Sequence, residues 1–145
     1  FLPAGPLRET KNRLKSVDMI INNGAEAEGE ISSQIEAECY VNLLTNEKKE
    51  LDYFKTKKCL AVSGIGNPKN FHNLLESQGV NLITKVFPDH HTFSKNDITF
   101  KEDYPIIMTA KDCVKCRQFA TSNMWYLSVR AMISADFYQQ LESKL

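Results

Sequence analysis

The chain has 145 residues, of which 42% are hydrophobic and 25% are charged, and its 18 basic and 18 acidic side chains balance. This length and composition fit one globular domain, or a small domain with an arm, and exclude a disordered or fibrous chain. The formal net charge of zero excludes the basic character typical of nucleic-acid binding, and no apolar run reaches the roughly 20 residues of a membrane-spanning helix.

The first residue is Phe1 rather than an initiator methionine, and the segment from Phe1 to Pro6 contains too much Pro and Gly for regular structure. We interpret this start as a cut through a longer protein. Four cysteines without a disulfide framework, together with the lack of a signal peptide, indicate a reducing, cytosolic setting.

The first part of the chain, up to Lys58, carries only weak structural patterns. The elements expected there are a helix over 7–15, a buried strand over 19–21 that runs into a turn at 22–24, an exposed acidic loop over 25–34, a strand over 39–44 and a charged linker over 47–58. The pattern changes at Cys59, so we place a domain boundary near Lys57.

From Cys59 onward, strands alternate with helices. An apolar strand over 59–62 is followed by a helix with Asn67 as its N-cap, Pro68 in its first turn and Gly79 at its end. The elements expected after it are strands over 80–86, 106–108 and 124–129, a short turn capped by Ser94, and helices over 111–119 and 134–145. The alternation predicts an α/β fold with a small, mainly parallel sheet flanked by helices.

The turn Gly64-Ile65-Gly66-Asn67-Pro68 joins the first of these strands to its helix, so its N–H groups could face an anion. A dinucleotide fingerprint would require a third glycine where the chain has Lys69, and Pro68 lacks an N–H group. These departures favour a tight packing turn over a phosphate cradle. The P-loop pattern G-x-x-x-x-G-K-[ST] occurs nowhere, so this chain has no recognisable triphosphate site.

Cys113 and Cys116 have the C-x-x-C spacing of redox and zinc sites. A structural zinc site would need a second pair of ligands, and His72, His90 and His91 are poorly spaced to supply it. The pair also lacks the flanking Pro and Gly residues expected of a thioredoxin-like motif. We therefore interpret both residues as buried free cysteines, with a thiol oxidoreductase as an alternative.

Asp89-His90-His91 follows a predicted strand and Phe87-Pro88, at the edge of the sheet where α/β proteins bind ligands. Adjacent side chains point in different directions, so chelation by both histidines is not expected. One histidine beside a carboxylate is a candidate general base, because its pKa lies near neutrality. A capped loop without chemistry is an equally good interpretation of this segment.

Two other polar segments are weaker candidates. Arg8 and Glu9 follow a rigid turn and could present a guanidinium to a phosphate or carboxylate, although a solvated helix face is favoured. Thr109 is expected to cap a helix that has Lys111 and Asp112 in its first turn.

Taken together and in this order, these segments resemble the C-terminal part of the tetraacyldisaccharide 4'-kinases, the lipid A 4'-kinase family of Gram-negative bacteria. The segments that carry the resemblance are 2–9, 61–68, 87–91, 108–116 and 125–127. The resemblance implies a full-length kinase that transfers the γ-phosphate of ATP to the 4'-hydroxyl of tetraacyldisaccharide 1-phosphate in lipid A biosynthesis.

The same resemblance implies that ATP and Mg²⁺ are bound mainly by a P-loop lobe absent from this chain. That lobe would also contact the cytoplasmic face of the inner membrane. Without it, the chain alone would be soluble, and because it lacks the P-loop it would be inactive. Residues 1–56 would form an inter-lobe segment, 57–133 the small α/β domain of a two-lobed kinase, and 134–145 a C-terminal helix.

The resemblance also assigns roles to individual residues. His90 would be the general base, paired with an aspartate of the absent lobe, and Arg8, Glu9 and Asp89 would line the active-site cleft. No metal ligand is expected in this chain. The family usually has Thr-Glu-Lys-Asp where this chain has Ala110 in the second position, so no function is carried over to residue 110. The alternative from another class is a non-catalytic α/β module that binds an anion or a nucleotide at residues 64–68.

Overall fold

A computed structural model describes residues 10–24 and 29–145 of the chain. The chain divides into two compact units, one of which combines the residues up to Ile35 with Ala131–Leu145, while the other is Glu36–Arg130. Arg8 and Glu9 lie outside the described residues, so their expected place in a cleft stays a prediction. The expected boundary near Lys57 also stays a prediction.

The larger unit is built on four parallel strands in the order β5-β4-β6-β7. These strands are β4 (Lys58–Ser63), β5 (Asn81–Val86), β6 (Ile106–Thr109) and β7 (Met124–Ile133). Five consecutive β4 residues, from Cys59 to Ser63, are buried, as expected for a parallel strand covered on both faces. The predicted α/β fold with a mainly parallel sheet is confirmed.

A further strand, β2 (Ile31–Asn42), makes the sheet mixed because it runs antiparallel to β7. The Leu43 N–H donates to the Met124 carbonyl, and Ser128 donates to Glu38 further along the pair. Two shorter strands join β2: β1 (Ile21–Asn23) in parallel and β3 (Lys48–Lys49) in antiparallel orientation.

Three expectations for the first part of the chain were wrong. The described end of the expected acidic loop is the start of β2, where Ile31 is buried, and the expected linker contains β3 and the buried Phe54. The strand expected over 19–21 is displaced: β1 is Ile21–Asn23, which includes part of the expected turn at 22–24, and Ile21 is 46% exposed instead of buried. Local patterns miss these features because β1 and β3 form by pairing with β2, and Phe54 packs against Tyr40 and Trp125.

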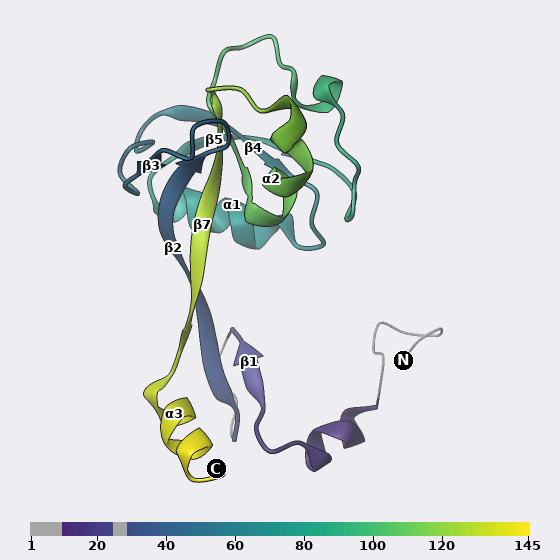
Figure 1. The fold of residues 1–145 in the computed structure, drawn as a ribbon, viewed down its shortest axis with the longest axis vertical. Coiled ribbons are helices and arrows are strands. Elements are labelled where there is room, and N and C mark those ends of the chain that lie inside the picture. The colour runs from purple at the N-terminus through teal and green to yellow at the C-terminus, as the bar shows by residue number, and fades with distance from the viewer. Residues whose placement is uncertain (1–9, 25–28) are drawn as a thin grey trace. The chain divides into compact units, whose positions relative to one another are not determined.

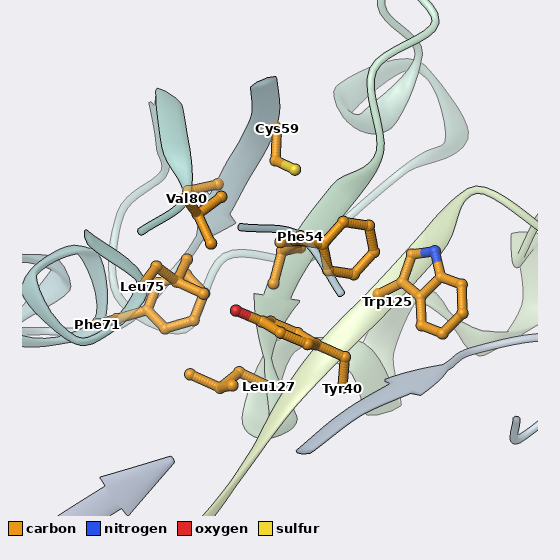
Figure 2. Close-up of a cluster of buried hydrophobic side chains, with 10 residues drawn as sticks. Tyr40, Phe54, Cys59, Phe71, Leu75, Val80, Trp125 and Leu127 are labelled. Carbon is orange, nitrogen blue, oxygen red and sulfur yellow. The ribbon is translucent and has the colours of Figure 1, made fainter. Parts of the chain in front are cut away.

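Helices cover both faces of the parallel strands (Figure 1). Side chains alternate along a strand, so Cys59 and Ala61 pack with α1 (Pro68–Ser77), whereas Leu60 and Val62 pack on the opposite face with α2 (Ala110–Cys116). Figure 2 shows the first of these clusters, in which Tyr40, Phe54 and Trp125 meet through edge-on ring contacts. Aromatic pairs of this kind add to the stabilisation from burial alone.

The remaining elements are short. They are the 3₁₀ helices η1 (Lys11–Ser16), η2 (Lys95–Ile98) and η3 (Arg117–Phe119), and the C-terminal helix α3 (Ala135–Glu142). Ser94 and Asp97 form the expected cap of η2, and Gly79 ends α1 with a φ of +78°. Within the described part of the chain, no helix combines the length and apolar character needed to cross a bilayer.

Candidate active site

Two loops and the first turn of α2 meet at the carboxyl edge of the parallel strands. The loops follow β4 at residues 64–67 and β5 at 87–91, whereas α2 begins directly after β6; parallel strands bring such segments together at one edge. Lys111 Nζ lies 3.3 Å from Asp89 Oδ1, and a Cβ atom added to Gly66 would lie 3.5 Å from Asp89 Oδ2. The Gly64 N–H donates to Asp112 Oδ2 over 2.9 Å. The two loops and the first turn of α2 therefore form one connected site.

Asp89 and His90 form the exposed part of this site. His90 Nε2 lies 3.6 Å from Asp89 Oδ2, and the His90 N–H donates to Asp89 Oδ1 over 3.0 Å. The imidazole is 78% exposed, so it is open to a substrate. A hydrogen bond from Lys111 lowers the pKa of Asp89, and the adjacent His90 lowers it further. The carboxylate therefore stays ionised at neutral pH beside an accessible imidazole.

His91 is placed quite differently, although it is the next residue. Its ring stacks on Phe87 at 4.6 Å between centroids and meets the edge of Phe93 at 4.9 Å. Its Nε2 atom lies 3.3 Å from Asp97 Oδ2. Hydrogen bonds from Ser94 lower the pKa of Asp97, and the contact with His91 lowers it further. His91 is thus an anchor of the loop, and His90 is the histidine that a substrate can reach.

The buried carboxylate of Asp112 stabilises the site through its hydrogen bonds. Asp112 has no exposed surface and accepts hydrogen bonds from Thr109 Oγ1 at 2.8 Å and from Lys115 Nζ at 3.3 Å, besides the one from Gly64. Thr109 caps α2 as expected, because its hydroxyl accepts the N–H of Asp112. The sequence analysis missed the supporting role of Asp112. The spacing of Thr109 and Asp112 fits a capping box, and this signal could have drawn attention to the residue.

Cys113 and Cys116 face the buried cluster beneath α2. Burial raises the pKa of Cys116 to about 11 and also raises the pKa of Cys113. A thiol with a raised pKa is a poor nucleophile at neutral pH, which weighs against a thiol oxidoreductase. Among residues 10–24 and 29–145, no group of three or more His, Cys, Asp or Glu side chains could hold a metal ion.

The turn at residues 64–68 fits packing better than anion binding. The N–H of Gly64 is already bonded to Asp112, and Pro68 has none. The carboxylate of Asp89 lies against Gly66, where it would repel an anion. A Cβ atom on Gly64 would lie 3.2 Å from the Phe93 ring, so a glycine is needed there for close packing.

Fold and site together define an α/β domain with an accessible histidine–aspartate pair at the ligand-binding edge of its sheet. The family model of LpxK, tetraacyldisaccharide-1-P 4'-kinase, matches residues 1–145. The chain belongs to this family.

Individual relatives agree with the family match. The chain is 50% identical over 145 residues to a tetraacyldisaccharide 4'-kinase of Ruthia magnifica subsp. Calyptogena magnifica, covering 100% of this chain and 46% of that protein. It is 43% identical over 147 residues to the kinase of the same name from Pseudomonas paraeruginosa, covering 99% of this chain and 44% of the relative. The chain thus spans less than half the length of these curated relatives.

A solved structure has the same fold. The crystal structure of LpxK from Aquifex aeolicus in complex with ATP matches 97% of this chain and 46% of its own, with a TM-score of 0.69 and 23% sequence identity. The similarity agrees with the sheet order and the flanking helices described above.

Proposed function

We propose that this chain is the C-terminal portion of a lipid kinase that transfers the γ-phosphate of ATP to the 4'-hydroxyl of tetraacyldisaccharide 1-phosphate in lipid A biosynthesis. The observation that carries the proposal is the accessible imidazole of His90, held beside the ionised Asp89 at the edge of the sheet. The names of the relatives that are 50% and 43% identical supply the reaction class and the substrate.

In the proposed reaction, His90 acts as the general base. The 4'-oxygen forms a bond to the γ-phosphorus while the bond from that phosphorus to the bridging oxygen of ADP breaks, and the hydroxyl proton passes to the imidazole. An aspartate of the absent lobe would pair with His90 on its other side. Asp89 stays charged through the reaction because Lys111 holds it, so it can stabilise the imidazolium that forms.

ATP and Mg²⁺ are assigned mainly to the part of the full-length protein that this chain lacks. We place the Mg²⁺ ligands there because Asp89, the exposed carboxylate of the site, is already paired with Lys111, and no group of three or more His, Cys, Asp or Glu side chains among the described residues could hold a metal ion. We assign Arg8 and Glu9 to the lining of the active-site cleft on the resemblance alone. The full-length enzyme is proposed to act at the cytoplasmic face of the bacterial inner membrane.

The proposal is tested by incubating the purified full-length protein with tetraacyldisaccharide 1-phosphate and Mg-ATP and measuring phosphate addition by mass spectrometry. We expect transfer to the 4'-position. The present chain by itself should show none, because phosphoryl transfer needs a phosphate-binding loop and a metal ion that its residues do not supply. As a control for activity that is lost because the protein has been divided, the chain is mixed with a separately produced N-terminal half and assayed in the same way. Absence of transfer by the full-length protein would refute the proposal.

A further inference from the structure

The loop that carries His90 has an unfavourable backbone conformation at that residue. The His91 N–H donates to the Pro88 carbonyl over 3.1 Å and closes a turn in which His90 has a φ of +62°. Turns usually place glycine or asparagine at a position of positive φ, because a Cβ atom is strained there. A histidine at this corner of the turn therefore requires support from its surroundings.

Part of that support comes from a side chain of α2. Lys115 Nζ donates to the carbonyl of His91 over 3.1 Å, and this residue closes the turn. The same ammonium lies 3.3 Å from Asp112 Oδ1 and 5.6 Å from the centre of the Phe93 ring. One cation thus links the turn to a buried carboxylate and to the aromatic side chain against which His91 packs.

Asp112 keeps Lys115 in this place. Because a carboxylate with no exposed surface is costly unless paired, the ammonium is its necessary counter-charge. Its second oxygen accepts the Gly64 N–H at the start of the neighbouring loop, so both loops of the site and the first turn of α2 share this support. Asp112 has no exposed surface, and Lys115 Nζ donates to the His91 carbonyl and to Asp112 rather than to the side chain of Asp89 or His90.

We infer that Lys115 and Asp112 are positioning residues, which fix the turn at residues 88–91 so that the imidazole of His90 is presented to the substrate hydroxyl. The inference rests on the proposed function, because it assumes that His90 does chemistry. It assigns no contact with substrate to either residue. Their effect on the reaction passes through the backbone of His91.

The test uses the full-length protein with Lys115→Met and two readouts. The His91 amide should exchange its hydrogen about 10-fold faster or more, because the turn opens locally while the rest of the unit stays protected. The catalytic rate kcat should fall about 10- to 100-fold, the size of loss that a small misplacement causes, with KM for ATP unchanged. Lys115→Arg, which keeps the charge and the donors, should restore most of the rate.

Two further variants keep the test decisive. Lys101→Met makes the same change at an exposed residue and should alter neither readout. If Lys115→Met fails to fold because Asp112 is left unpaired, the double variant Asp112→Asn with Lys115→Met removes both charges and keeps an acceptor for Gly64. Unchanged exchange at His91, or unchanged kcat in a variant that exchanges faster, would overturn the inference. If the parent protein transfers no phosphate, the proposed function fails, and the exchange at His91 still decides whether Lys115 holds the turn.

Discussion

The loop after β5 contains two histidine–aspartate pairs with opposite surroundings. Asp89 and His90 form an exposed pair in which the imidazole is 78% accessible, whereas His91 and Asp97 form a packed pair with a ring that is 25% accessible. In the packed pair, the His91 ring stacks on Phe87 and meets the edge of Phe93, and Asp97 is part of the cap of η2. The comparison teaches that packing, and not residue type, assigns the two histidines their roles.

The two pairs also differ in what they contribute to folding. The ring contacts of His91 stabilise the folded loop, because they remove aromatic surface from water. His90 makes no ring contact within the described residues and occupies a backbone conformation that costs free energy. On the proposed function, stability and chemistry are divided between adjacent residues, and substitutions at the two positions should separate them.

The largest expected effect is on catalysis. In the full-length enzyme, His90→Ala should lower kcat by roughly 10²–10⁴-fold, the usual contribution of a positioned general base. KM for ATP should change little, because the nucleotide is assigned to the other part of the protein. Steady-state kinetics with saturating lipid substrate provides the measurement.

His91→Ala is the matched control for this experiment, since it removes the same side chain one residue away. We expect a much smaller loss of kcat, arising only from a less rigid turn. Equal losses in both variants, or a larger loss for His91→Ala, would show that the general base has been misassigned. No loss in either variant would move the chemistry away from this loop.

For the free energy of unfolding we expect the reverse order, with the larger loss in His91→Ala. His91→Ala removes two ring contacts and should lower the free energy of unfolding by about 1–2 kcal/mol. His90→Ala should stay within about 0.5 kcal/mol of the parent, as is usual for an exposed residue. Urea unfolding of each variant, followed by the fluorescence of Trp125, measures the two free energies of unfolding. A larger loss for His90→Ala would contradict the division of roles.

Much of the parallel sheet could be predicted from the sequence, but the details of the site could not. The central residues of β4 and β6 are continuous apolar runs, and the helix from Pro68 has its cap and its stop signal in the sequence. The placement of Asp89 and His90 at the carboxyl edge follows from the end of a strand. The burial of Asp112 and the separation of the two histidines depend on residues from several different elements and loops, and no local pattern reports such contacts.

The positive φ of His90 allows a substitution that should increase stability, by a smaller amount than His91→Ala decreases it. His90→Gly should raise the free energy of unfolding by about 0.5–1 kcal/mol, because glycine tolerates positive φ without the Cβ strain. His90→Ala, which keeps a Cβ atom, is the control and should not show the gain. Thermal unfolding of both variants provides the comparison. If His90→Gly is no more stable than His90→Ala, the turn does not strain its third residue.

The smallest expected effect is a change in the pKa values of Asp89 and Asp97. Lys111 lowers the pKa of Asp89, and Ser94 lowers that of Asp97. A carboxyl with a lowered pKa stabilises the folded state above its unfolded pKa of about 3.9, and this contribution is lost as pH falls through the folded value. Lys111→Met should therefore raise the pKa of Asp89 toward its ordinary value and leave Asp97 unchanged. Ser94→Ala removes the hydroxyl donor but keeps the backbone N–H donor, so it should raise the pKa of Asp97 only in part and leave Asp89 unchanged. Carboxyl ¹³C chemical shifts followed from pH 6 downward, assigned with Asp89→Asn and Asp97→Asn, separate the two titrations. If Lys111→Met shifts both carboxyls equally, the exposed and packed pairs are one electrostatic unit; independent shifts show that each pair keeps its own partner.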